Sequence, residues 1–218
     1  MRDRNEIVLD LDGKHLGATL TIPPAAHGIV IFAHGSGSSR HSPRNIFVAQ
    51  TLNARGLITL LLDLLTQDEE EIDSRTAALR FDIALLARRV GLATDWCRRD
   101  AQLKSHRIGY FGASTGAGAA LLAASTRDDI DAIVSRGGRP DLAGPALGDV
   151  QAPTLLIVGE RDPKVIELNR GVAAQLRTHN ELAIVPGATH LFEEPGTLEQ
   201  VAQLAQAWFL RYLIPAVA

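Results

Sequence analysis

Three residues of this chain have the types and the order that nucleophilic acyl transfer requires. Ser114 lies in the segment GYFGASTGAG, where Gly112 and Gly116 complete a GxSxG pattern, and Asp162 and His190 follow in that order. A serine hydroxyl becomes nucleophilic when a histidine takes its proton, and an acid holds that histidine in the required tautomer. We therefore predict that Ser114, Asp162 and His190 form a catalytic triad.

Ser114 stands at the junction of two segments of different character. The apolar run RIGYFG precedes it and the alanine-rich stretch TGAGAALLAAS follows it. A strand that turns sharply into a helix presents a hydroxyl at the corner, and glycines on either side let neighbouring elements approach. The alternative interpretation is a glycine-rich packing corner without chemistry, because GxSxG also arises by chance.

Asp162 and His190 each lie just past an apolar run, in GERDPKV and GATHLFEEPG. If these runs are parallel strands, both side chains reach the same edge of the sheet as Ser114. Asp162 could instead cap a helix that begins at Pro163. Glu160 is a substitute acid, and Asp63 is a further candidate, although it precedes the serine and so breaks the expected order.

The segment FAHGSGSSRHSPRN, residues 32–45, is the candidate for a loop that stabilises an oxyanion. Acyl transfer needs preformed donors at the developing negative charge, and backbone N–H groups supply them. We predict one donor at Thr115, the residue after the nucleophile, and a second at Ser36. A phosphate-binding loop is the competing interpretation, but the GK-Ser/Thr ending of that motif is absent.

Several arginines fall in segments that the pattern places near the same edge. Arg40 and Arg44 flank the 32–45 loop, and Arg136 and Arg139 follow another apolar run. Because guanidinium groups match carboxylates well, we predict that Arg40, Arg136 and Arg139 bind an anionic part of the substrate. The alternative is a set of surface ion pairs, for example with the acidic run at 67–73.

The elements that must position these residues can be read from the hydrophobic pattern. Residues 6–22 alternate on either side of Asp12 and Gly13, which predicts an antiparallel hairpin. Short apolar runs without alternation follow, which is typical of buried parallel strands, and helical segments separate most of them. The expected strands are 28–34, 57–63, 107–113, 131–137, 152–159 and 182–188, and the expected helices are 43–55, 82–99, 115–125, 164–176 and 197–213.

This order of elements predicts an α/β fold. We expect a mostly parallel central sheet with helices on both faces, an N-terminal antiparallel hairpin, and one domain over residues 1–218. Segment 136–153 is too short to hold a helical cap domain, so we expect an open site. The acidic run at 67–73 is interpreted as a solvated loop or the start of a helix.

Composition narrows the class of partner and the compartment. The formal net charge of −3 gives no electrostatic reason to expect nucleic acid or an anionic membrane. The single cysteine, Cys97, fits a reducing compartment. No run approaches the roughly 18 apolar residues of a membrane span, and the first residues lack the apolar core of a secretory signal. We expect a cytoplasmic monomer or homodimer without a metal ion or cofactor.

Four blocks of the sequence, HGSGSS, GYFGASTGAG, PTLLIVGERD and GATHLFEEPG, resemble a serine member of the dienelactone hydrolase family within the α/β-hydrolase superfamily. The resemblance covers nearly the whole chain. It implies a hydrolase of small carboxylic esters or lactones with Ser114, Asp162 and His190 as its triad. Dienelactone hydrolases proper have a cysteine as nucleophile, whereas this chain has Ser114 at that position and its only cysteine elsewhere.

Other functions share the same machinery. Thioesterases and amidases use the same triad, and the sequence does not separate them from esterases. A non-catalytic binding module on the same fold is a different class, because the fold alone does not fix the function. Such modules usually lack a triad member, and all three are present here.

Overall fold

The N-terminal hairpin is the first element of the chain. The structure is a computed structural model and describes residues 3–214. Strands β1 (Asp3–Leu11) and β2 (Lys14–Ile22) pair antiparallel along their whole lengths, which confirms the predicted hairpin. Asp12 and Gly13 both have positive φ, 59° and 73°, as the tight turn requires.

The hairpin continues into an eight-stranded sheet with the order β1-β2-β4-β3-β5-β6-β7-β8. Strand β2 is antiparallel to β4, and every pairing from β4 to β8 is parallel. All six runs predicted as parallel strands are strands: β3 (Gly28–Ala33), β4 (Leu57–Leu62), β5 (Arg107–Ala113), β6 (Ala132–Arg136), β7 (Thr154–Gly159) and β8 (Asn180–Val185). Every residue of β3, β4, β6 and β7 is buried, which explains why these strands show no alternation.

The helices follow the strands. They are α1 (Pro43–Asn53), α2 (Gln67–Thr76), α3 (Ile83–Arg99), α4 (Thr115–Ala124), α5 (Pro163–Ala173) and α6 (Thr197–Leu213). Ser42 caps α1 and Asp82 caps α3 through their side chains, and Thr66 forms a capping box with Glu69 at the start of α2. Each cap satisfies an amide that would otherwise lack a partner, and so fixes where the helix begins.

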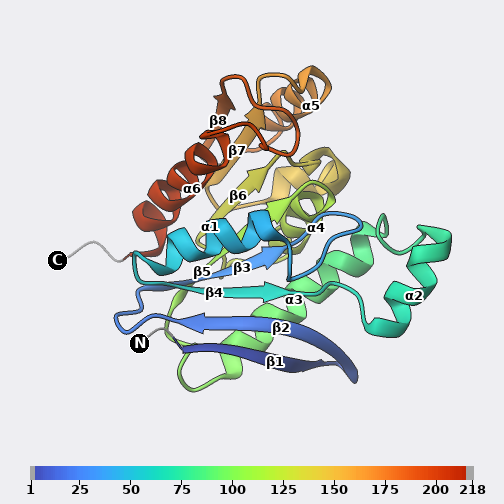
Figure 1. Cartoon of the computed structure of the whole chain (residues 1–218), viewed down its shortest axis with the longest axis vertical. Coiled ribbons are helices and arrows are strands. Elements are labelled where there is room, and N and C mark those ends of the chain that lie inside the picture. Colours follow the sequence, from blue (N-terminus) through green and yellow to red (C-terminus); the bar gives the residue numbers. More distant parts are fainter. Residues whose placement is uncertain (1–2, 215–218) are drawn as a thin grey trace.

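Helices cover both faces of the sheet, as predicted. Residues of α1 and α6 pack on one face in a cluster that includes Leu52 and Phe209, and α3 and α4 pack on the other with Val90 and Leu121. Figure 1 shows α1 and α6 on the same side of the strands, with α3 on the opposite side. The sheet is therefore held rigidly between two apolar layers, and its carboxyl edge supports the loops described below.

Two segments outside the predicted elements are helical, and for the acidic run at 67–73 the structure has the helix start, one of the two interpretations that the sequence left open. The acidic run at 67–73 belongs to helix α2, because its capping box and three acidic residues in the first turn favour a helix start. Segment 136–153 carries the 3₁₀ element η1 (Pro140–Asp149), which is kinked at Gly144. No helix within residues 3–214 is long and apolar enough to cross a membrane.

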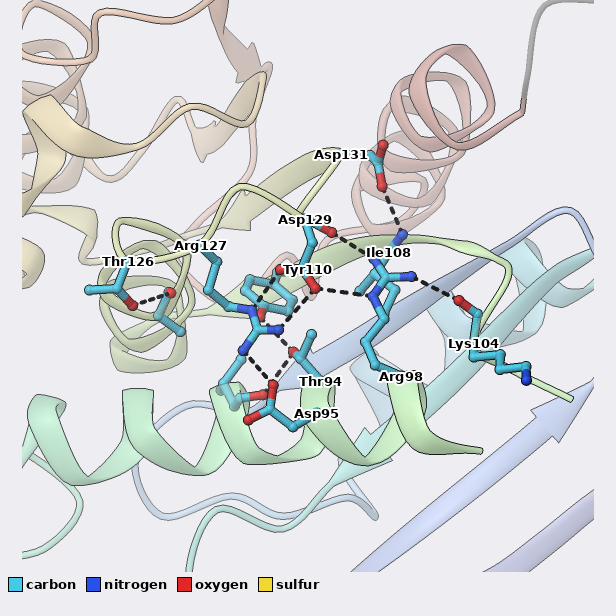
Figure 2. Close-up of polar contacts among 12 residues, drawn as sticks. Thr94, Asp95, Arg98, Lys104, Ile108, Tyr110, Thr126, Arg127, Asp129 and Asp131 are labelled. Atoms are coloured by element: carbon cyan, nitrogen blue, oxygen red, sulfur yellow. Dashed lines mark hydrogen bonds and ion pairs between the residues drawn. The ribbon is translucent and has the colours of Figure 1, made fainter. Parts of the chain in front are cut away.

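A cluster of ion pairs joins α3 to the turn before β6. Arg127 contacts Asp129 and Asp95 at 2.7 Å each, and the Nε of Arg98 lies 3.0 Å from Asp129 (Figure 2). Hydrogen bonds from the two arginines lower the pKa of Asp129 to about 2. This cluster lies among α3, β5 and the turn at 126–131, and it uses four charged residues that the motifs did not single out.

Candidate active site

Ser114 occupies the sharp turn between β5 and α4. Its backbone has φ 50° and ψ −122°, a combination that residues with a Cβ rarely adopt. The flanking glycines are required by close packing: a Cβ at Gly116 would lie 2.2 Å from the carbonyl oxygen of Ala33, and one at Gly112 would lie 2.4 Å from Ala117 Cα. The strained corner is thus held in place by the strand and helix on either side of it.

The Ser114 hydroxyl is not used to hold the fold together. It does not cap α4, and within residues 3–214 it makes no side-chain hydrogen bond. Thr115 begins α4, so its amide belongs to the first turn of the helix, where N–H groups have no intrahelical acceptor. The corner therefore presents a free hydroxyl beside free amides at the positive end of a helix.

His190 and Asp162 are joined by a short hydrogen bond. The His190 Nδ1 lies 2.6 Å from Asp162 Oδ2. Asp162 precedes Pro163 at the start of α5, yet its carboxylate does not cap that helix. Of the two interpretations of Asp162, contact with His190 is the one that the geometry supports.

The loop after β7, which contains Asp162, is hydrogen-bonded to the loop after β8, which contains His190. The Arg161 amide donates to the Ala188 carbonyl at 2.9 Å, and the Gly187 amide donates to Glu160 Oε2 at 2.7 Å. Glu160 thus joins the loop after β7 to the loop after β8 rather than contacting His190. The sequence had suggested Glu160 only as a substitute acid.

Asp63 lies elsewhere. Its carboxylate forms an ion pair with the Arg40 guanidinium and accepts the Arg40 backbone N–H at 2.7 Å. Arg40 also pairs with Glu6. Arg40 and Asp63 line an open hollow of about 980 Å³ between the 37–43 segment and α2, and Ser114 is not among its lining residues.

Ser114 and His190 face a common cavity of about 230 Å³. The 35–45 segment forms one wall, and the ends of β5 and β6 form another. The residues that line it are Gly35, Ser36, Ser38, Ser42, Arg44, Asn45, Ala113, Ser114, Arg136, His190 and Leu191. None of these residues is an aspartate or a glutamate, so the charged side chains on its wall are cationic.

The predicted oxyanion loop passes beside the serine. Ser36 lines the Ser114 cavity, and it also meets Thr115 in a small adjoining space. His34 is buried beneath this loop: its Nε2 accepts the Leu64 N–H at 3.1 Å and its Nδ1 lies 2.9 Å from the Gly35 carbonyl oxygen. Burial lowers the pKa of His34 and keeps the ring neutral, as the accepted hydrogen bond requires.

The three arginines predicted to bind substrate have different surroundings. Arg40 is paired with Asp63, and Arg139 is paired with Asp141 at 2.7 Å; neither lines the Ser114 cavity. Arg136 does line it, and only 7% of its surface is exposed. Arg44, the fourth arginine of the predicted active edge, lines the same cavity and pairs with Glu193 at 3.3 Å.

Cys97 lies in the core and not at the Ser114 cavity. Cys97 is fully buried on α3, and burial raises the pKa of its thiol to about 12. Within residues 3–214 no group of three or more His, Cys, Asp or Glu side chains is arranged to hold a metal ion. Leu191, Ser38 and Ser42 also line the cavity. The sequence pointed to their segments but not to these residues, because such residue types occur on most surfaces.

Solved structures with the same architecture include one close match. The crystal structure of a dienelactone hydrolase from Anabaena variabilis superposes with a TM-score of 0.96 and is 56% identical, covering 97% of this chain and 99% of that one. Est1E from Butyrivibrio proteoclasticus has a TM-score of 0.79 at 19% identity, covering 94% of this chain and 98% of its own. At that identity the second match shows the fold alone.

Sequence comparisons give a family and a pair of longer relatives. The sequence model of the dienelactone hydrolase family matches residues 16–212. Two proteins from strains of Mycobacterium tuberculosis, each named "Putative phosphoribosyl transferase", are 58% identical over 195 residues. The match covers 89% of this chain but 43% of each relative, so the chain spans less than half the length of these curated relatives.

Proposed function

The chain belongs to the dienelactone hydrolase family, and on that premise we propose that it is a serine hydrolase of small carboxylic esters or lactones. The observation that carries the proposal is the 2.6 Å hydrogen bond between His190 and Asp162, together with the cavity that both His190 and Ser114 line. A histidine oriented by an acid beside a free, strained serine is the arrangement that acyl transfer requires.

The hydrogen bond between His190 and Asp162 also determines which nitrogen of His190 can accept a proton. Asp162 is an acceptor, so Nδ1 of His190 donates to it, and Nε2 is left unprotonated in the neutral ring. Nε2 takes the Ser114 proton as the oxygen attacks the ester carbonyl, and then passes that proton to the departing alcohol. Water, activated by the same nitrogen, attacks the acyl-enzyme and releases the acid.

The negative charge on the carbonyl oxygen needs donors while the tetrahedral intermediate exists. We assign these donors to the backbone N–H groups of Ser36 and Thr115. Thr115 begins α4, so the helix dipole adds to its amide, and His34 supports the loop that contains Ser36. Backbone donors held by a packed helix and a buried histidine need little reorganisation during the reaction.

The nucleophile in this proposal is serine and not cysteine. Cys97 is fully buried, and its raised pKa of about 12 keeps it as a thiol at neutral pH. Thioester or amide hydrolysis would use the same residues, and these substrates remain alternatives within the same mechanism. The name of the mycobacterial relatives belongs to proteins more than half of whose length is unmatched by this chain, and a non-catalytic binding module would not need the free Ser114 hydroxyl.

The experiment is a stopped-flow measurement with p-nitrophenyl acetate. Because an acyl-enzyme forms before it is hydrolysed, we expect an initial burst of p-nitrophenol that approaches one equivalent per chain. Ser114→Ala should abolish both the burst and steady turnover, whereas Cys97→Ala should retain both. A full burst in Ser114→Ala, or its loss in a folded Cys97→Ala, would contradict the proposal. Thioesters and lactones tested under the same conditions then define the substrate class.

A further inference from the structure

The loop that contains Ser36 is anchored at both of its ends. At its start, the buried side chain of His34 accepts a hydrogen bond from the Leu64 N–H, and at its end Ser42 caps α1. Between these two points, residues 36–41 belong to no helix or strand. Regular backbone pairing therefore does not hold this stretch, and its position depends on the contacts that its own residues make.

Arg40 is the residue that ties this stretch to the rest of the protein. Among the described residues, it is the only member of 36–41 with a hydrogen bond beyond the segment 35–42. Its backbone N–H donates to Asp63 Oδ1 at 2.7 Å, and its guanidinium pairs with the other oxygen of that carboxylate. Its Nε also lies 3.2 Å from Glu6 Oε2. Arg40 thus joins the loop to the end of β4 and to β1.

The surface of the sheet leaves room for this ion pair only because β2 has a glycine there. A Cβ at Gly17 would lie 2.5 Å from Arg40 Nη1 and 2.8 Å from Asp63 Oδ2, so the pair lies directly against the strand backbone. The Asp63 N–H in turn donates to the Gly17 carbonyl oxygen at 2.9 Å. The side chains of Arg40 and Asp63 are 25% and 17% exposed, respectively. An ion pair that is withdrawn from water in this way is screened less than an exposed one.

The position of the Ser36 N–H matters because this group is one of the two proposed oxyanion donors. It donates to no described residue, so it is available to a ligand. A displacement of about 1 Å in a group that contacts the reacting atoms can slow a reaction by about 10²-fold. A loop that lost its attachment at Arg40 would therefore lose much of the benefit of this donor.

We propose that Arg40 is a positioning residue for the oxyanion site. Through its ion pair with Asp63, it holds the loop so that the Ser36 N–H is directed at the carbonyl oxygen of the ester. This role rests on the proposed function, because it needs Ser36 to take part in the reaction. The sequence had suggested that Arg40 contacts the substrate, whereas the proposed role acts through the loop.

Stopped-flow kinetics with p-nitrophenyl acetate separate positioning from a purely structural role. An oxyanion donor stabilises the transition states of both acylation and deacylation. Arg40→Gln should therefore slow the burst and the steady rate by similar factors, about 10- to 100-fold, and leave the dissociation constant of the ester largely unchanged. A variant that is only less stable would give a smaller burst amplitude with unchanged rate constants, and that result would overturn the proposal.

Arg88 provides a matched control. It forms another arginine–aspartate pair, with Asp12 at the hairpin turn, but these side chains are 65% and 60% exposed and do not touch the loop. Arg88→Gln should leave both rate constants unchanged, and an equal slowing in this variant would overturn the proposal. Asp63→Asn should slow both steps, and the Arg40→Gln/Asp63→Asn double variant should be no slower than the slower single variant. Fully additive losses would overturn the assignment to the ion pair.

Hydrogen exchange followed by NMR tests the attachment of the loop without catalysis. The N–H groups of Ser38, His41 and Ser42 donate within the loop, so their exchange rates report on its order. They should exchange faster in Arg40→Gln than in the wild type, while the amides of α4 exchange as before. Unchanged exchange in the loop would overturn the proposal. If the loop amides exchange faster but the wild type gives no burst, the proposed function fails and the attachment by Arg40 stands.

Discussion

Replacing Ser114 by glycine should stabilise the protein relative to replacing it by alanine. The residue at this corner has φ 50° and ψ −122°, where a Cβ is unfavourable. Alanine keeps the Cβ and therefore the strain, while glycine removes both. Both variants lack the hydroxyl, so the comparison isolates the backbone from the chemistry.

The magnitude follows from two opposing terms. A residue held in such a conformation is destabilised by about 1–3 kcal/mol. Glycine also loses more backbone entropy on folding than alanine does, and this opposes the gain from removed strain by about 0.5–1 kcal/mol. Ser114→Gly should thus be more stable than Ser114→Ala by about 0.5–2 kcal/mol. For a chain of this length that difference corresponds to a Tm about 1–8 °C higher.

Thermal unfolding of the two variants in the same buffer measures the difference, and urea denaturation checks that both unfold with the same slope. Ser114→Ala should be equal to the wild type in Tm within about 1 °C, because the serine hydroxyl makes no hydrogen bond within residues 3–214. A Tm for Ser114→Gly at or below that of Ser114→Ala would refute the strain argument.

Three further predictions test the neighbours of the site and the fold. Asp162→Asn should lower kcat for p-nitrophenyl acetate by up to about 10⁴-fold, because it permits the wrong tautomer of His190, while Asp63→Asn should lower it far less; steady-state kinetics with equal losses would count against the assignment. Gly116→Ala should lower the Tm by several degrees, since its Cβ would lie 2.2 Å from a carbonyl oxygen, and an unchanged Tm would show that the corner yields. Asp129 has a lowered pKa of about 2, against an ordinary value of 3.8, so its contribution to stability is present above about pH 4 and is lost as the pH falls toward 2. The Tm difference between wild type and Asp129→Asn should therefore shrink over that range, and a constant difference would contradict the reasoning.

The sequence predicted the sheet well because its strands are buried on both faces. Uninterrupted apolar runs such as the one ending at Leu62 leave little choice of structure. The glycines beside Ser114 also located the sharp turn between β5 and α4. The position of His190 after an apolar run located the loop after β8. The contact between Asp162 and His190 was predicted, although the roles of the two residues in catalysis stay predictions.

What the sequence could not show was which charged residues are paired. Arg40, Arg136 and Arg139 all follow predicted strands, and the sequence does not distinguish them. In the structure Arg40 and Arg139 are paired with acids, whereas Arg136 is buried without an acidic partner among the described residues. Asp141 lies two residues from its arginine, but Asp63 reaches Arg40 only through the fold. The network around Asp129 in Figure 2 was missed for the same reason, because its members come from separate elements.

The central claim is that Ser114 is the covalent nucleophile, and intact-protein mass spectrometry with a fluorophosphonate probe tests it most directly. We predict that one probe molecule adds per chain, that peptide mapping places it on Ser114, and that ester hydrolysis is lost in proportion to labelling. Ser114→Ala should remain unlabelled. A label on any other residue, or labelled protein that retains full esterase activity, would contradict the account.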